Sequence, residues 1–146
     1  MGFAADLNKM CARAGDKAEL VVRRTALELQ SGMVEKSAVG DPSGWKGPAP
    51  EGYTGGRFKG NWQVGIGVIN TVTDSPLDKG GESTIARAKI ALENWKPGQT
   101  IYLSNSLPYG RRLEYEGWSA QCPAGMVRLT VQAYSDAVKK AVESIK

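Results

Sequence analysis

The sequence predicts an α+β domain with a long N-terminal helix, a small antiparallel sheet and a C-terminal helix. Three observations predict it. Residues 3–36 carry an apolar stripe at helical spacing, two short later segments are rich in β-forming residues, and the C-terminal residues again step by three and four. The length of 146 residues fits a single domain, residues 1–146, of ordinary size.

The first predicted helix covers residues 3–36. Apolar or small side chains recur there at the spacing of one helix face, namely Phe3, Leu7, Met10/Cys11, Ala14, Ala18, Val21/Val22, Thr25, Leu29 and Met33. A helix of this length spans about 50 Å at 1.5 Å per residue. This is long for so small a domain, so we expect the domain to cover one face and part of the remainder to meet another copy. Cys11 lies on the stripe, which predicts a buried free thiol.

A Gly/Pro-rich loop is predicted at residues 39–60, because its composition cannot sustain a regular element. Trp45 and Tyr53 lie within it. Aromatic side chains in a long loop are typical of binding anchors, and both residues are candidates for a subunit interface. The alternative is that the two rings fold back onto their own domain.

The clearest strand signal is at residues 61–68, where Trp62, Val64, Ile66 and Val68 alternate with polar residues or glycine. The glycines on the polar face suggest a bend, a bulge or the close approach of another backbone. A helix is predicted at 82–95 and a second strand at 100–103. The two strands are expected to pair.

The segment 107–128 predicts two short helical pieces joined by a tight loop. Pro108 suits a first helical turn that Asn105 or Ser106 can cap, and Gly117 suits its end. Pro123 is expected to start a second helix that runs to the C-terminus. The loop between them, residues 118–122, should lie at the surface.

Trp118 is the proposed anchor of that surface loop, since an exposed Trp beside polar residues is typical of an interface. The flanking charged residues, expected to form surface ion pairs and a polar rim, are Arg111, Arg112, Glu114 and Glu116. The alternative is that Trp118 packs between the two helices and sets their angle.

Composition argues against catalysis. The chain has no His, two Cys and a formal net charge of +4. The absence of His removes the usual general base and most zinc sites, and Glu114 and Glu116, two apart on a helix, point to different faces. The glycine-rich stretch 55–60 lacks phosphate-loop spacing. No disulfide, signal peptide or membrane span is predicted. We therefore expect no catalytic residue, no cofactor and no metal.

Three segments together resemble a known family. Residues 54–62 (TGGRFKGNW), 107–119 (LPYGRRLEYEGWS) and 120–128 (AQCPAGMVR) are similar to the tail-completion and neck proteins of long-tailed bacteriophages. The order of a long first helix, this strand start and the two later motifs is similar as well.

The resemblance implies a virion structural protein at the head–tail junction or the upper end of the tail, assembled in the host cytoplasm. It would form a homo-oligomeric ring, sixfold or twelvefold. Its neighbours would be head-completion, connector, tail-tube or terminator proteins, and genome DNA would pass through the lumen without sequence-specific binding. No membrane contact, cofactor or catalysis is implied.

Two other functions stay open from the residues alone. One is nucleic-acid binding through scattered basic side chains, Arg57, Lys59, Arg111 and Arg112, although a concentrated basic face is more typical of such proteins. The other is a small hydrolase with a carboxylate site, which the absent His and the scattered acidic residues disfavour.

Overall fold

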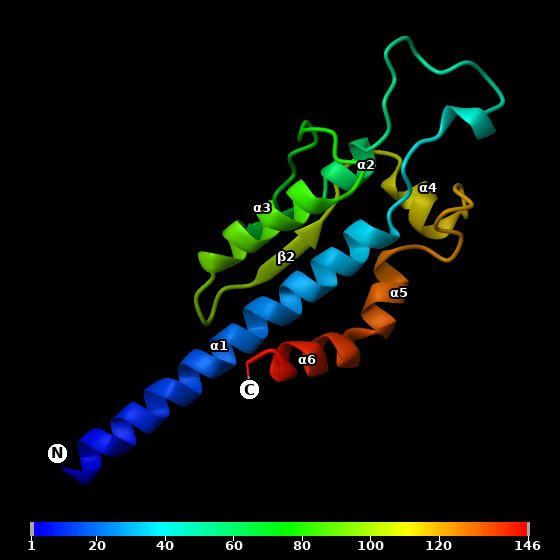
Figure 1. Ribbon diagram of the computed structural model, residues 1–146. Helices are drawn as coiled ribbons and strands as arrows, with labels where there is room; N and C mark the ends of the chain where they lie inside the picture. Colours follow the sequence, from blue (N-terminus) through cyan, green and yellow to red (C-terminus); the bar gives the residue numbers. More distant parts are fainter. Residues whose placement is uncertain (1, 146) are drawn as a thin grey trace.

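The computed structural model describes residues 2–145 and has the predicted α+β architecture, most of it helical (Figure 1). In chain order the elements are α1 (Phe3–Lys36), η1 (Pro42–Gly44), α2 (Arg57–Gly60), β1 (Gln63–Ile66), α3 (Glu82–Glu93), β2 (Ile101–Ser104), α4 (Gly110–Tyr115), α5 (Val127–Gln132) and α6 (Tyr134–Glu143). None of the helices within residues 2–145 is both long and apolar enough to cross a membrane.

Helix α1 has the predicted bounds, but only its second half belongs to the core. Its buried residues are Thr25, Ala26, Gln30, Met33 and Val34. The first half of the helix extends alone beyond the rest of the protein (Figure 1). Cys11 is therefore exposed, and the prediction of a buried thiol is wrong, because no other described segment reaches that part of the stripe.

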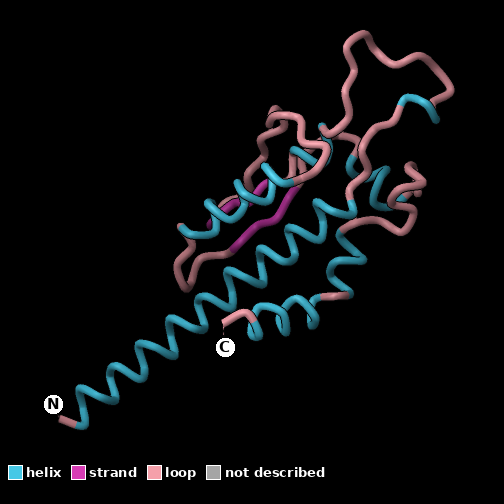
Figure 2. The backbone as a smooth tube through the Cα atoms, viewed as in Figure 1, coloured by secondary structure: helices cyan, strands magenta, loops and turns pink. Residues whose placement is uncertain are grey.

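The sheet has two antiparallel strands, β1 and β2, with Val64 opposite Leu103 (Figure 2). Strand β1 is shorter than the predicted segment 61–68. It ends before Gly67, whose φ of +74° turns the chain, and Val68 is exposed instead of lying on the apolar face.

The chain after β1 folds back over the face of the strand that was predicted to carry polar residues and glycine. A Cβ at Gly65 would lie 2.1 Å from the carbonyl oxygen of Val68, so this close approach of another backbone, one of the predicted explanations for the glycine, requires glycine there. Gln63 is buried by the same returning segment, and its amide donates to the Ser75 hydroxyl over 2.8 Å. A polar residue is thus buried with a partner.

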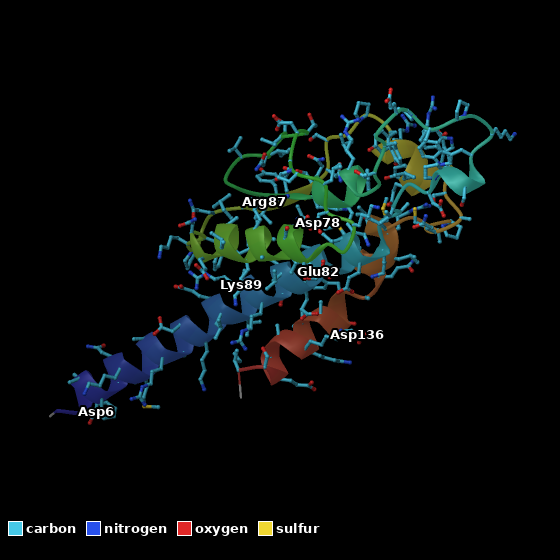
Figure 3. All side chains as sticks on the ribbon, turned by 45° about the horizontal axis from the view of Figure 1, so that its top comes forward. Asp6, Asp78, Glu82, Arg87, Lys89 and Asp136 are labelled. Carbon is cyan, nitrogen blue, oxygen red and sulfur yellow. The ribbon has the colours of Figure 1, made fainter. Side chains whose placement is uncertain are left out.

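Asp78 and Arg87 fix α3 against the segment around α2 and β1 (Figure 3). Asp78 caps α3 by accepting hydrogen bonds from the backbone nitrogens of Gly81 and Thr84, both over 2.8 Å. Arg87 donates to the carbonyl oxygen of Gly60 over 2.8 Å. Burial by itself raises the pKa of Asp78, but the hydrogen bonds from Thr84 and Gly81 and the charge of Arg87 outweigh it and hold the pKa below its usual range.

The core has two parts. The smaller lies between the sheet, α1 and α3, around Ala26, Val64, Ala88 and Leu92. The larger lies where α1, α2, α4 and the start of α5 meet, and includes Met33, Val34, Phe58, Trp62, Leu107, Leu113, Cys122 and Met126. Trp62 is 4 % exposed, and its indole nitrogen donates to the Ser37 hydroxyl over 2.7 Å.

The C-terminal region differs from the prediction of one helix starting at Pro123. Residues 118–126 form irregular turns, α5 begins at Val127, and the chain breaks at Ala133 before α6. Helix α4 is shorter than predicted, but Gly117 follows it at a φ of +58°, as expected for a helix end. Asn105 does not cap α4; its amide nitrogen donates to the Phe58 carbonyl oxygen over 2.8 Å.

Candidate interaction surface

A chain of aromatic contacts runs from the core to the surface. The ring of Trp62 lies 5.9 Å from that of Phe58, Phe58 lies 5.7 Å from Tyr109, and Tyr109 lies 6.5 Å from Trp118. The first two rings are buried, Tyr109 is half-buried and Trp118 is 57 % exposed. Aromatic pairs at these separations attract one another. The exposed indole of Trp118 is therefore connected to the core by a continuous series of ring contacts, called the aromatic column below.

Arg112 completes the support of Trp118. Its guanidinium carbon lies 5.2 Å from the centre of the indole ring, which is a cation–π contact. Trp118 therefore contacts Tyr109 and Arg112 and leaves more than half of its surface exposed to solvent. The predicted surface position of Trp118 is confirmed, and the alternative that it packs between two helices is wrong.

A second pair of the same kind flanks the first. The guanidinium carbon of Arg128 lies 5.0 Å from the ring of Tyr115, which is 64 % exposed. Tyr109, Tyr115 and Arg128 were not among the predicted interface residues. A signal was present, because Tyr109, Arg112, Tyr115 and Trp118 recur every third residue, which is close to one turn of helix.

The loop pair lies near this surface. The rings of Trp45 and Tyr53 meet edge to face with centres 4.9 Å apart, and Trp45 is 43 % exposed. Burial raises the pKa of Tyr109, and the positive charge of Arg57 opposes this rise.

Two hydrogen bonds attach the base of the loop to the turn after α4. The amide of Gln121 donates to the carbonyl oxygen of Val39 over 2.8 Å and accepts from the Val39 nitrogen over 3.0 Å. The structure thus brings the loop after α1 and the turns after α4, which hold the two predicted groups of anchors, to the same end of the molecule, opposite the free half of α1 (Figure 1).

The prediction that Glu114 belongs to an exposed polar rim is wrong. It is 6 % exposed, and its carboxylate accepts hydrogen bonds from the backbone nitrogens of Met126 (2.7 Å), Val127 (3.0 Å) and Arg128 (3.0 Å). Its carboxylate also forms an ion pair with Arg128 at 3.2 Å, within the same joint between α4 and α5. Glu114 is therefore the N-terminal cap of α5 and no surface residue, because the turns after α4 bring the start of α5 onto it.

The other predicted rim residues, Arg111, Arg112 and Glu116, are exposed. Of the basic residues in the nucleic-acid alternative, Arg57 is also exposed, whereas the stem of half-buried Lys59 lies against Gly81 at the start of α3.

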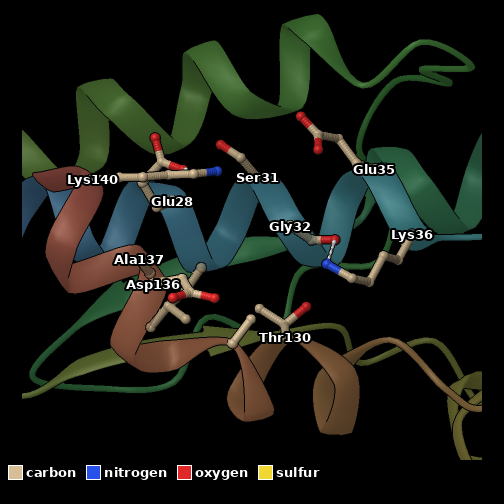
Figure 4. Close-up of a pocket in the computed structure, with 11 residues that line it drawn as sticks. Glu28, Ser31, Gly32, Glu35, Lys36, Thr130, Asp136, Ala137 and Lys140 are labelled. Atoms are coloured by element: carbon tan, nitrogen blue, oxygen red, sulfur yellow. Dashed lines mark hydrogen bonds and ion pairs between the residues drawn. The ribbon is translucent and has the colours of Figure 1, made fainter.

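A polar groove lies between α1 and the C-terminal helices α5 and α6 (Figure 4). Charges of both signs line it: Lys140 lies 3.8 Å from Glu28, and Lys36 donates to the carbonyl oxygen of Gly32 over 3.4 Å. Such local pairs are typical of a solvated surface. Among residues 2–145, no three His, Cys, Asp or Glu side chains gather closely enough to hold a metal ion.

Comparisons with known proteins add no relative: no protein-family model, no curated protein and no solved structure matches this chain. The candidate site therefore stands on its own geometry, a preorganised cluster of exposed aromatic and arginine side chains around Trp118.

Proposed function

We propose that this protein is a structural subunit of a homo-oligomeric ring in the neck or upper tail of a long-tailed bacteriophage. One observation carries the proposal: the exposed Trp118 indole is fixed in place by Tyr109 and Arg112. Interface hot spots are enriched in Trp, Tyr and Arg, and a side chain that is already ordered loses little entropy on binding. The phage setting rests on the resemblance of residues 54–62 and 107–128.

In this proposal the surface around Trp118 contacts the next subunit of the ring or the next protein along the tail axis. The neighbours would be head-completion, connector, tail-tube or terminator proteins, with DNA passing through the lumen. The function is structural, and the protein carries out no reaction.

The test is Trp118→Ala, with Tyr134→Ala as the matched control, because Tyr134 is a similarly exposed aromatic residue, at 53 %, on α6. We expect both variants to keep the circular dichroism spectrum of the wild type. Negative-stain images and light scattering should show rings for the wild type and the control and a reduced ring fraction for Trp118→Ala. Normal rings in that variant, or none in the wild type, would contradict the proposal.

The loop pair offers a second test of the same proposal. The prediction of an irregular loop over 39–60 is wrong at its end, where α2 and the buried Phe58 occupy residues 57–60. Trp45 and Tyr53 contact each other on the remaining Gly/Pro-rich segment, so we expect residues 41–54 to be cut by protease in the isolated subunit and protected by a neighbour in the assembly. Equal cleavage of both forms would remove this segment from the interface.

Nucleic-acid binding is the second candidate, because Arg112 stacked on Trp118 also resembles the platforms on which single-stranded bases stack. The salt dependence of binding separates the two. A nucleic-acid interface loses affinity steeply with added salt, since counterions are released. A protein ring in which the neighbouring subunit buries Trp118 is expected to persist at the same salt concentrations.

A further inference from the structure

The free half of α1 carries an apolar stripe that no segment within residues 2–145 covers. Phe3 is 82 %, Leu7 46 % and Met10 67 % exposed. An isolated helix of this length is marginally stable in water. Covering the apolar stripe would bury hydrophobic surface and so stabilise this half of α1.

The stripe continues the face of α1 that α6 covers. Helix α6 runs antiparallel to α1: Lys140 lies 3.8 Å from Glu28, and Ser144 accepts a hydrogen bond from Arg24 over 2.5 Å. Steps of three and four lead from Glu28 back along the same face, through Thr25, Val21, Ala18, Ala14, Met10, Leu7 and Phe3. Helix α6 ends beside Arg24, so the N-terminal part of the face it occupies is left open (Figure 1).

We propose that this open face is covered by the same half-helix of a second copy, running antiparallel and related by a twofold axis. The register that aligns the stripes sets Leu7 opposite Met10 of the second copy and Phe3 opposite Ala14 of the second copy. Phe3 then meets a small side chain, and Leu7 meets the flexible side chain of Met10, which adapts its shape to its neighbours. Ala4 and Cys11 flank the stripe on one side, and their small size lets the two helices approach closely.

The charges on the other flank agree with this arrangement. Asp6, at the free end of α1 (Figure 3), and Arg13 are seven residues apart on that flank. The antiparallel register places Asp6 next to Arg13 of the second copy, and the twofold axis repeats the pair. A parallel pair would set Asp6 beside Cys11 of the second copy and form no such ion pair.

The position of α6 also favours the antiparallel arrangement. In a parallel pair both α6 helices would lie at the same level on the paired face and compete for space. The antiparallel pair leaves the two folded bodies at opposite ends of the joined helices. This contact is isologous and does not depend on the ring proposed above, which needs a heterologous contact.

Charge reversal tests the pairing. Asp6→Arg alone places two arginines together across the axis, and Arg13→Asp alone places two aspartates together, so each variant should dimerise about tenfold more weakly than the wild type. Mixing the two variants restores both ion pairs and should restore the dimer. Sedimentation in a Trp118→Ala background measures this without any ring contact, and Asp16→Arg, on the outer face of the helix, is the matched control.

Thiol cross-linking tests the direction of the helices. A chain with Ala4→Cys and Cys11→Ser, mixed with chains that keep Cys11, should give cross-linked dimers with a short bis-maleimide. Either chain alone should give few, because like positions lie about 10 Å apart along the axis. A wild type that is monomeric at all concentrations, failure of the mixed charge variants to associate, or efficient cross-linking between two Cys11 thiols would overturn the pairing. Each of these results leaves the Trp118 ring contact open to its own test.

Discussion

The Oε2 atom of Glu114 lies 2.7 Å from the backbone nitrogen of Met126, inside the joint between α4 and α5. The same carboxylate serves the next two backbone nitrogens, so one charge satisfies three N–H groups at a helix start that would otherwise be unpaired. Hydrogen bonds to an ionised acceptor are about twice as strong as neutral ones. Glu114 thus connects the helix that carries the Trp118 surface to the helices that pack on α1.

Glu114→Gln should destabilise the protein by roughly 1.5–3 kcal/mol, the contribution expected of a hydrogen bond to a charged group. The substitution removes the charge and turns an amide N–H₂ toward backbone donors. Glu116→Gln is the matched control, because Glu116 is exposed, and it should change the free energy of unfolding by no more than about 0.5 kcal/mol. Urea unfolding measures both, and equal effects would mean that the cap contributes nothing.

Acid should weaken the same joint. Burial alone raises the pKa of Glu114, but the hydrogen bonds from Met126, Arg128 and Val127 outweigh it and hold the pKa below its usual range. A carboxyl group with a lowered pKa in the folded state stabilises the protein above its unfolded pKa, near about 4, and the contribution is lost as the pH falls through the folded pKa.

Wild-type stability should therefore fall below about pH 4, and the difference from Glu114→Gln should narrow there. Urea unfolding at a series of pH values measures this. Asp78, whose pKa is also lowered, remains in both proteins and adds to the acid sensitivity of each. A difference between the two proteins that stays constant with pH would contradict the assignment.

Helical periodicity predicted the bounds of α1, because that pattern is local. Alternation and β-forming residues predicted the two strands, and their expected antiparallel pairing is confirmed. Periodicity says that a stripe exists and not what covers it, so Cys11 was misplaced. Glu114 was misread for a related reason. Its partners lie twelve to fourteen residues along the chain, beyond turns whose path no local pattern specifies.

Trp62→Ala should cost on the order of 3–5 kcal/mol, because the ring is buried and its removal leaves a cavity. Trp62→Phe keeps an aromatic ring but loses the donor to Ser37, and we expect a smaller loss. Trp118→Ala is the comparison at the exposed end of the same aromatic column and should cost less than about 1 kcal/mol. Thermal unfolding of the three variants gives the order, and equal losses at the two Trp positions would contradict the core placement of Trp62.

The two thiols should differ sharply in reactivity. Cys11 is exposed on the free half of α1, whereas Cys122 is 3 % exposed in the core, where burial raises the pKa of its thiol and so disfavours the reactive thiolate. A chromogenic disulfide reagent should label one thiol per native chain rapidly and the second only as the protein unfolds.

Cys11→Ser should abolish the rapid phase and leave stability unchanged. Cys122→Ser should keep the rapid phase but lower stability, because it places a hydroxyl among buried apolar groups. Two rapid phases in the native wild type would show that the turn holding Cys122 opens readily, and the joint around Glu114 would then be looser than its hydrogen bonds indicate.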